Sequence, residues 1–129
     1  MLKAEENSQH KLFTMKFSES LKKNSDFRRV YRKGHSKADS LFVLYVLPND
    51  LNENRIGISV SKKVGNSVVR HHITRLVRES YRLNEDSFIC GYDLVLVARP
   101  YARSKSFDQV SSSLLSLMKY HHLLLEQAL

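Results

Sequence analysis

The segment that most constrains the fold is a strand-like run at residues 55–61 that leads directly into a helix-like pattern. Apolar residues alternate there with small ones: Ile56, Gly57, Ile58, Ser59, Val60 and Ser61. This two-residue period is typical of a strand with one apolar face and one small-residue face. A face of glycine and serine has no bulk to pack, so another group can approach the backbone there.

The helix-like pattern covers residues 67–83. Its apolar residues recur at helical spacing, and the expected buried stripe consists of Val69, Ile73, Leu76 and Leu83. A strand followed at once by such a helix predicts an α+β chain, in which helices pack on a small mixed sheet.

Further elements flank this unit. Residues 41–47 form a β-rich apolar run, which we expect to pair antiparallel with residues 55–61 across a polar turn. Residues 92–98 are mostly apolar and predict a central strand, and a short extra strand is expected within or shortly before 61–64. A final helix should begin at a capping box formed by Ser106 and Gln109.

An earlier short helix is expected between Ser25 and Gly34. Ser25 is a good N-cap, and Gly34 can supply a left-handed residue at the C-terminal end. Phe27, Val30 and Tyr31 share one face of this helix, because they lie three and four residues apart.

The charge of the chain indicates a polyanionic partner. Lys and Arg number 21 against 13 Asp and Glu, which gives 129 residues a formal net charge of +8 and favours RNA, DNA or an acidic membrane. No apolar run approaches the length of a membrane span. The lone Cys90, expected to be half-buried, excludes an intrachain disulfide and a multi-cysteine metal cluster. A cytoplasmic protein is the simplest expectation.

The N-terminal residues 1–20 differ from the rest of the chain. They lack periodicity and mix charges, so they predict a loose arm before a single domain over residues 21–125. Met15 is a second possible start, and the residues before it are expected to be dispensable for RNA affinity. Truncation to Met15 tests this expectation, which a large loss of RNA affinity would contradict.

Positive charge is concentrated around the predicted basic helix. Residues 55–82 hold seven Lys or Arg and one acidic residue. His71, Arg75, Arg78 and Arg82 follow helical spacing along one face, with Arg70 one position round. Arginine suits phosphate because its planar fork donates two parallel hydrogen bonds. A solvated helix face usually mixes both signs, so the pattern favours RNA binding over plain solvation.

Four residues just before this helix admit two interpretations. Lys62, Lys63, Gly65 and Asn66 precede its first N–H groups, which can attract an anion, although Gly65 can equally be a turn residue. A DNA-reading helix-turn-helix requires a preceding helix, whereas a strand precedes here, so DNA is a poor candidate for the partner.

These residues resemble a known family. Residues 55–70 read Arg-Ile-Gly-Ile-Ser-Val-Ser-Lys-Lys-Val-Gly-Asn-Ser-Val-Val-Arg, and with Ile73, Arg75, Leu76, Arg78 and Glu79 they are similar to the signature of the bacterial ribonuclease P protein subunit. Residues 21–34 resemble the first helix of that family, and residues 94–100 resemble its last strand. The resemblance covers roughly residues 21–117, and its central block is specific in length, order and residue type.

The resemblance implies a fold and a function. The fold is α-β-β-β-α-β-α with a left-handed βαβ crossover, as in a domain of a ribosomal protein. The RNA subunit performs the chemistry, while the protein holds the 5′ leader of precursor tRNA and assists Mg²⁺-dependent cleavage at the mature 5′ end. The implied partners are ribonuclease P RNA and precursor tRNA, in a 1:1 complex of a monomer with the RNA. DNA and membranes are not expected as partners, and Mg²⁺ is expected mainly on the RNA.

Two binding surfaces are implied residue by residue. For the RNA subunit the positions are Lys62, Lys63, Asn66, Arg70, His71, His72, Arg75, Arg78 and Arg82. For the leader they are Phe27, Tyr31, Tyr45, Arg55, Gly57, Ser59, Ser61 and Lys63. The aromatic rings would stack on unpaired bases, the small residues would let the strand lie close, and Arg55 and Lys63 could neutralise its phosphates. Ordinary core packing is the alternative for the aromatic residues, above all for Phe27.

The sequence departs from the family at one element. The family has Arg-Asn-Arg where this chain has Arg70, His71 and His72, so only the first position matches. Histidine donates hydrogen bonds and is positively charged once protonated. We therefore expect docking to the RNA subunit to be weaker or more pH-sensitive than in a relative that has Arg-Asn-Arg. Titration of the affinity between pH 6 and 8, beside the double variant His71→Asn/His72→Arg, tests this. Equal affinities and slopes would contradict it, and the neighbouring cations could make the exchange nearly silent.

Catalysis by this chain alone is not expected. A metal nuclease needs clustered carboxylates, and the acidic residues here are scattered. The pairs His71–His72 and His121–His122 are not ready dyads, because adjacent helical residues point roughly 100° apart. The alternative function is a stand-alone RNA-binding or ribosome-associated protein without a role in cleavage.

Overall fold

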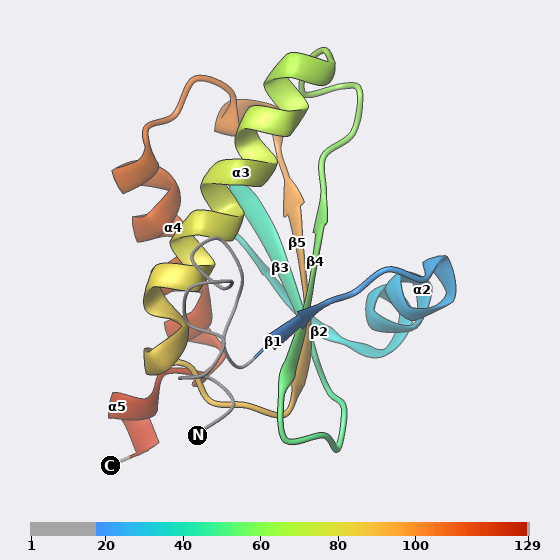
Figure 1. The fold of residues 1–129 in the computed structure, drawn as a ribbon, viewed down its shortest axis with the longest axis vertical. Helices are drawn as coiled ribbons and strands as arrows, with labels where there is room; N and C mark the ends of the chain where they lie inside the picture. The colour runs from blue at the N-terminus through green and yellow to red at the C-terminus, as the bar shows by residue number, and fades with distance from the viewer. Residues whose placement is uncertain (1–17, 129) are drawn as a thin grey trace, which may run out of the picture.

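A mixed sheet of five strands forms the centre of the computed structural model, which describes residues 18–128 (Figure 1). Across the sheet the strands follow the order β1 (Ser18–Ser20), β4 (Asn54–Ser59), β5 (Tyr92–Ala98), β3 (Phe42–Pro48) and β2 (His35–Ala38). The pairs β1–β4 and β4–β5 are parallel, whereas β3–β5 and β2–β3 are antiparallel. The α+β class and the mixed sheet expected from the sequence are confirmed.

Strand β5 occupies the centre because it is apolar on both faces. Its residues Leu94, Val95 and Leu96 have no exposed surface. The central position expected for this strand is confirmed, but the direct pairing of residues 41–47 with 55–61 is wrong, since β5 lies between β3 and β4. A strand with two apolar faces would leave apolar surface in water at an edge, so insertion between two half-buried strands is favoured.

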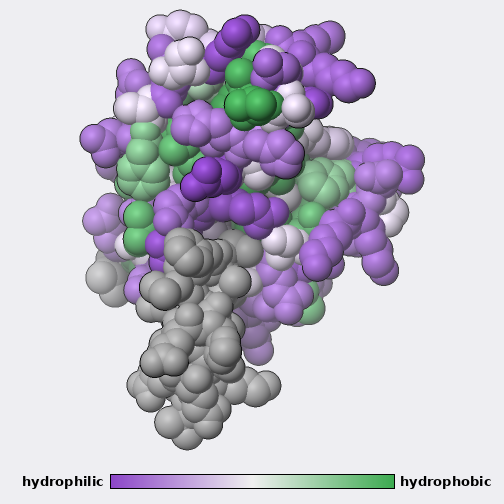
Figure 2. All heavy atoms as spheres, turned by 45° about the horizontal axis from the view of Figure 1, so that its top comes forward, coloured by the Kyte–Doolittle hydropathy of each residue, from purple (hydrophilic) through white to green (hydrophobic). Residues whose placement is uncertain are grey.

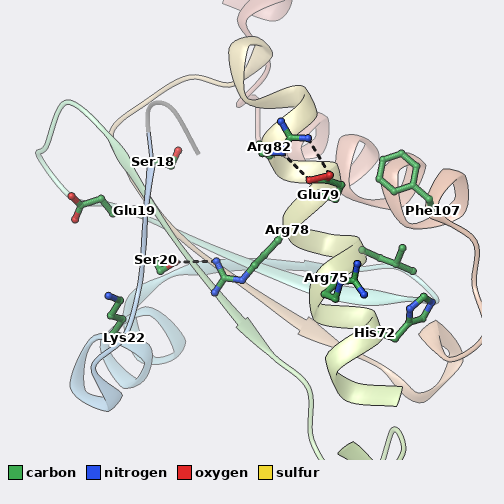
Figure 3. Close-up of a pocket in the computed structure, with 11 residues that line it drawn as sticks. Ser18, Glu19, Ser20, Lys22, His72, Arg75, Arg78, Glu79, Arg82 and Phe107 are labelled. Atoms are coloured by element: carbon green, nitrogen blue, oxygen red, sulfur yellow. Dashed lines mark hydrogen bonds and ion pairs between the residues drawn. The ribbon is translucent and has the colours of Figure 1, made fainter. Parts of the chain in front are cut away.

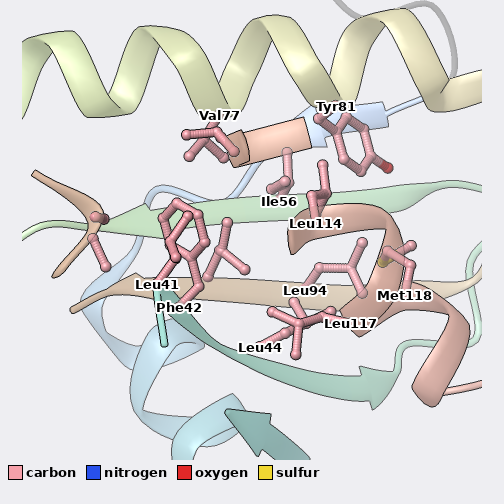
Figure 4. Close-up of a cluster of buried hydrophobic side chains, with 14 of the residues drawn as sticks. Leu41, Phe42, Leu44, Ile56, Val77, Tyr81, Leu94, Leu114, Leu117 and Met118 are labelled. Carbon is pink, nitrogen blue, oxygen red and sulfur yellow. The ribbon is translucent and has the colours of Figure 1, made fainter. Parts of the chain in front are cut away.

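Two long helices, α3 (Ser67–Asn84) and α4 (Phe107–Tyr120), cover one face of the sheet (Figure 1). Their inward side chains meet those of the strands in the main hydrophobic core (Figure 4). The largest fully buried side chains there include Phe42, Ile73, Tyr81, Leu114 and Met118. The expected helix at residues 67–83 is confirmed to within one residue, and so is the capping box at the start of α4.

The buried stripe of α3 differs from the expected one. Leu83 is 58% exposed, whereas Val77 and Tyr81 are fully buried. A tyrosine is tolerated in the core because its hydroxyl makes hydrogen bonds with Ser18 Oγ at 2.8 Å and Asn54 Nδ2 at 3.2 Å. Burial raises the pKa of Tyr81 to about 12, so the phenol stays neutral.

Helix α2 (Asn24–Lys33) lies on the opposite face of the sheet (Figure 1). It begins earlier than expected, with Lys23 rather than Ser25 at its N-cap position. Gly34 after it is extended, with a φ of −78°, so the expected left-handed residue is wrong. A Cβ on Gly34 would lie 2.6 Å from the carbonyl oxygen of Val30, and this close approach explains the glycine.

Short polar strands form both edges of the sheet. Local periodicity does not predict β2, because His-Ser-Lys-Ala lacks apolar alternation. β1 corrects the expected loose arm for residues 18–20, and the rest of that arm lies outside the described residues. The extra strand expected near 61–64 is wrong, since the chain turns there and the Val64 N–H donates to the Ser61 carbonyl at 3.1 Å.

The order α-β-β-β-α-β-α is confirmed in α2, β2, β3, β4, α3, β5 and α4. The structure adds β1, two 3₁₀ turns, η1 (Glu85–Ser87) and η2 (Pro100–Ala102), and the short helix α5 (Leu125–Ala128). Cys90 lies in a bend before β5 and is exposed rather than half-buried. None of the helices within residues 18–128 is long and apolar enough to cross a membrane.

Candidate RNA interface

Helix α2 covers only part of the sheet face on which it lies. It packs there around a small buried cluster of Leu21, Val30 and Val95. The strand register places Val95 between Gly57 on β4 and Tyr45 on β3. This row of residues is therefore part of the protein's own core.

The next row of the same face borders that buried cluster, and its central residue, Val97, packs against the cluster. The row consists of Ser59 on β4, Val97 on β5 and Val43 on β3, which the register places opposite one another. All three side chains are only partly buried, and Ala38 continues the row on β2 as an exposed residue. We call these four residues the open strip. The open strip is a shallow surface of small and β-branched side chains.

Three aromatic rings stand beside the open strip. The ring centroids of Tyr31 and Tyr45 are 5.0 Å apart, with an edge-on angle of 75°, and those of Phe27 and Tyr31 are 6.4 Å apart. Tyr31 is 38% exposed, whereas Phe27 is half-buried and packs against the α2 cluster. Phe27 therefore packs as part of the core, which was the alternative to base stacking for this residue. Tyr31 keeps ring surface available to a ligand.

Gly57 does not belong to the open surface. It is buried, and a Cβ at this position would lie 2.5 Å from Phe27 Cζ and 3.3 Å from Leu21 Cβ. The ring of Phe27 thus occupies the space that the missing side chain leaves. The expectation that Gly57 lets another molecule approach the backbone is wrong, because α2 makes that approach itself.

A buried carboxylate fixes α2 to the sheet. The Asp93 side chain on β5 has no exposed surface and accepts hydrogen bonds from Arg55 Nε at 2.8 Å and Arg55 Nη2 at 2.7 Å. Arg29 Nη2 of α2 donates to it at 3.0 Å, and so does Asn49 Nδ2 at the same distance. Asp26 adds a second carboxylate, 3.5 Å from Arg29 and 3.7 Å from Arg55. One cluster therefore links α2, β4 and β5.

Hydrogen bonding decides the protonation state of Asp93. Burial alone would raise the pKa of its carboxyl, but hydrogen bonds from Arg55 and Asn49, with the charge of Arg55, hold the pKa below its usual value. The same partnership raises the pKa of Arg55. The guanidinium of Arg55, expected to neutralise phosphates of a bound strand, is therefore already committed to a carboxylate inside the protein.

The exposed face of α3 is basic. His71, Arg75 and Arg78 are exposed and share one side of the helix, as their spacing predicts. Arg82 is half-buried and forms a two-point pair with Glu79, with Nε–Oε1 at 2.8 Å and Nη2–Oε2 at 3.0 Å. The hydrogen bond from Arg82 lowers the pKa of Glu79. Arg82 consequently brings less uncompensated charge to this face than Arg75 or Arg78.

A hollow separates this face of α3 from β1 (Figure 3). Arg78 spans part of it, and its Nη1 donates to Ser20 Oγ at 3.0 Å. His72 and Arg75 line the hollow from α3, and Lys22 lines it from the segment after β1. Cations on two walls suit the phosphates of an RNA backbone. Residues 18–20, expected in a loose arm, also line this hollow, and Glu19 and Glu79 bring negative charge to it.

The segment before α3 carries the remaining predicted residues. Lys62 and Lys63 are exposed in the turn after β4. Asn66 is the N-cap of α3, and its Oδ1 accepts from the Val69 N–H at 3.0 Å, so this side chain already serves the helix. Arg70 is half-buried, unlike the exposed His71 beside it. The structure thus gathers most of these residues around the first two turns of α3.

The face seen in Figure 2 is largely hydrophilic. Hydrophilic side chains cover most of the described residues visible there, and hydrophobic ones form separate patches. Among residues 18–128, no group of three or more His, Cys, Asp or Glu is placed to hold a metal ion. The buried carboxylate of Asp93 is bound by two arginines. The described side chains therefore do not fit a magnesium site.

Some residues of the site could not be identified from the sequence. Val97 and Val43 are apolar strand residues, and only the strand register shows that they lie on an accessible strip. Asp93 could have been noticed in the sequence, because it is a charged residue at the start of an apolar strand. A charge that is buried in such a strand requires a partner. The identity of that partner, Arg55, depends on the parallel register of β4 and β5.

A small mixed sheet with a basic helix beside an open strip is the arrangement expected of an RNA-binding subunit, and comparison with known proteins identifies the family. The family model described as Ribonuclease P matches residues 15–122. A ribonuclease P protein component from Lachnoclostridium phytofermentans is 52% identical over 107 residues, which cover 83% of this chain and 92% of that relative. One from Alkaliphilus metalliredigens is 49% identical over 105 residues, covering 81% and 95%.

Solved structures agree with these relatives. The RNase P protein of Staphylococcus aureus matches with a TM-score of 0.75 and 38% identity, over 81% of this chain and 95% of that one. The RNase P protein from Thermotoga maritima matches with a TM-score of 0.73 and 30% identity, over 78% and 96%. The chain belongs to the bacterial ribonuclease P protein family. It is thus a component of the ribonuclease P holoenzyme, a tRNA-processing ribonucleoprotein.

Proposed function

We propose that this chain holds the 5′ leader of precursor tRNA on the open strip. The observation that carries the proposal is the row of Ser59, Val97 and Val43, which is left accessible beside the exposed ring of Tyr31. A single strand needs a shallow surface together with aromatic faces, and each base stack contributes about 1–3 kcal/mol without demanding a sequence. Lys63, exposed a few residues after β4, supplies charge for the phosphates.

The predicted leader-binding residues divide into two groups. Tyr31, Tyr45, Ser59, Ser61 and Lys63 contact the leader in this proposal. Phe27, Gly57 and Arg55 support the site instead, because Phe27 packs on Gly57 and Arg55 is bound to a buried carboxylate. Their role is to fix the position of α2, and with it the ring of Tyr31.

The basic surface of α3 and the turn before it binds the RNA subunit. Lys62, Arg75 and Arg78 are exposed cations on this surface, and His71 and His72 stand between them. Arg70 and Arg82 flank the surface from half-buried positions, and Asn66 holds the first turn of the helix in place. Because β4 ends at the open strip and leads into α3, the two surfaces meet at one connection. The protein can therefore hold the leader against the RNA subunit.

The chemistry belongs to the RNA subunit. Mg²⁺ supplies the electrophilic assistance for phosphodiester hydrolysis in the holoenzyme, and we assign it to the RNA, since the described side chains do not fit a site for it. The residues of this chain bind and orient the leader. One monomer binds one RNA in the cytoplasm, and neither DNA nor a membrane is a partner in this account.

The rival function, a stand-alone RNA-binding protein, is separated by a cleavage assay. Precursor tRNA is incubated with ribonuclease P RNA at physiological Mg²⁺, with this protein added or withheld. The proposal predicts a large stimulation by the protein. Absence of stimulation would favour the rival, and cleavage by the protein alone would contradict both functions.

Replacement of Tyr31 tests the leader site itself. In the reconstituted holoenzyme, Tyr31→Ala should weaken binding of precursor tRNA about tenfold, as expected for one lost base stack, and leave mature tRNA unaffected. Tyr31→Phe keeps the ring and should bind precursor tRNA like the unmodified protein. Equal losses for precursor and mature tRNA would show damage to the core instead of loss of a leader contact.

A further inference from the structure

The segment after β5 is a second basic and aromatic element outside the two surfaces described above. Residues 99–105, here called the basic loop, contain Arg99, Arg103 and Lys105 and no acidic residue. Arg99 and Arg103 are exposed. Tyr101 is 60% exposed, and the Nζ of Lys105 lies 3.7 Å from the centre of its ring. The loop thus combines positive charge with an accessible aromatic ring.

The backbone of the basic loop is held in one conformation. The Arg99 N–H donates to the carbonyl of Leu41 at 2.8 Å, and the Arg99 guanidinium donates to the carbonyl of Asp39 at 2.6 Å. Ala102 is buried and anchors the loop in the main core. Ser104 has a φ of 68°, a left-handed conformation that is unfavourable for a non-glycine residue and persists only where the surroundings enforce it. A preorganised loop loses little conformational freedom when it binds a partner.

The carboxylate beside the loop is bound by other groups. Asp39 Oδ1 accepts from the N–H groups of Leu41 and Phe42, and its Oδ2 accepts from Ser113. Arg99 therefore binds the backbone of Asp39 and not its carboxylate. Asp108, in the first turn of α4, follows the loop in sequence and is the other acidic residue near it along the chain. An anionic partner would offset this surplus of positive charge.

The sheet places the basic loop beside the proposed RNA-binding surface. Neighbouring parallel strands end at the same edge of a sheet, and Ser59 at the end of β4 pairs with Val97 near the end of β5. The turn with Lys62 and Lys63 follows β4, and the basic loop follows β5, so the two segments leave the sheet side by side. Ala102 also shares the main core cluster with Val64, just before α3.

We infer that the basic loop is a further contact for the RNA subunit of ribonuclease P. Arg103 and Lys105 bind its phosphates, and the face of the Tyr101 ring opposite Lys105 stacks on an unpaired base. The inference rests on the proposed role of α3 and extends that surface across the end of the sheet. RNA is the partner that matches this combination, because a ring face suits a base and the cations suit the backbone beside it.

Binding of the full-length protein to ribonuclease P RNA alone, measured at several salt concentrations, tests the inference. Arg103→Gln/Lys105→Gln should lower the affinity about tenfold and reduce the salt slope by about one to two counterions. Tyr101→Ala should lower the affinity about fivefold or more, and Tyr101→Phe should stay within about twofold of the unmodified protein. All these side chains lie in a surface loop, and thermal unfolding checks that each variant folds.

Matched controls exist at the other end of α4. Tyr120 is 56% exposed and also has a lysine over its ring, with Lys37 Nζ 4.7 Å from the ring centre, and Lys119 is an exposed cation beside it. Tyr120→Ala and Lys119→Gln should each leave the affinity and the salt slope unchanged. Losses equal to those of the loop variants would overturn the inference, because they would show an unspecific effect of surface charge and rings.

A comparison with α3 separates this inference from the proposed function. Suppose that Arg75→Gln/Arg78→Gln weakens binding of ribonuclease P RNA, but the loop variants keep the full affinity and the full salt dependence. The inference about the loop is then overturned, while the proposed role of α3 stands. If the α3 variant also retains full affinity, the proposed role of α3 fails as well. An effect of the loop variants on precursor tRNA alone, with unchanged affinity for ribonuclease P RNA, would likewise overturn the inference.

Discussion

The two faces of the sheet are built in different ways. On one face α3 and α4 exclude water, and side chains such as Phe42 and Leu94 have no exposed surface. On the other face the shorter α2 is held by a small apolar cluster and by the ion pairs of Asp93, and the row from Ser59 to Val43 stays accessible. The face covered by α3 and α4 stabilises the fold, and the partly covered face leaves room for a ligand.

The largest effect is expected on the face covered by α3 and α4. Phe42→Ala should lower the free energy of unfolding by about 3–5 kcal/mol, because it removes a fully buried ring and leaves a cavity. Denaturant unfolding measures the loss. The folded fraction should still prefer precursor over mature tRNA to the same degree. A selective loss of this preference would break the distinction between the two faces.

Removal of the carboxylate under α2 should have the next largest effect. Asp93→Asn leaves Arg55 and Arg29 without their buried partner and should cost about 2 kcal/mol, less than for a fully buried pair because both arginines keep some access to water. Leader binding should weaken as well, since α2 carries Tyr31. A fully stable variant with normal leader binding would show that the ion pairs do not position α2.

The same residue predicts a dependence of stability on pH. The carboxyl of Asp93 titrates near its ordinary value of 3.8 when the chain is unfolded and at a lower pH when it is folded. Its stabilising contribution is therefore fully present above about pH 4 and is lost as the pH falls through the folded pKa. In Asp93→Asn this loss of stability at low pH should be missing, as measured by unfolding between pH 2 and 7. If the free energy of unfolding falls equally in the two proteins as the pH is lowered, Asp93 is not the source of this pH dependence.

A smaller effect is expected from crowding the contact between α2 and β4. Gly57→Ala would place a methyl group 2.5 Å from Phe27 Cζ, so the ring must move, at a cost of about 1–2 kcal/mol. The double variant Gly57→Ala/Phe27→Leu makes room and should recover most of the loss in thermal unfolding. If Gly57→Ala is as stable as the unmodified protein but binds the leader poorly, Gly57 lies in the binding surface after all.

The sequence predicted the elements whose signals are local. The extent of α3 follows from its own periodicity, the start of α4 from a capping box of two residues, and the centrality of β5 from its apolar composition. The exposed line of His71, Arg75 and Arg78 needed only helical spacing. These features are independent of the rest of the fold.

Features that depend on distant partners were missed or misassigned. The edge strands β1 and β2 are polar and exist because a neighbouring strand supplies their hydrogen bonds. Gly34 suggested a left-handed residue, but it is a glycine because the carbonyl groups of Val30 and Val46 lie close to it. Gly57 suggested an open surface, but the ring of Phe27 lies against it. Arg55 resembled a free cation until the parallel register placed it beside Asp93.

Site-directed crosslinking tests the central claim, that the leader lies on the open strip, most directly. The exposed Cys90 is first replaced by serine, and a short photoreactive group is attached to Val97→Cys, with Leu83→Cys on α3 as the matched control. In the holoenzyme, the group at position 97 should crosslink to leader nucleotides of precursor tRNA and give no tRNA product with mature tRNA. Leader crosslinks from position 83 instead of position 97, or equal products with both tRNAs, would contradict the account.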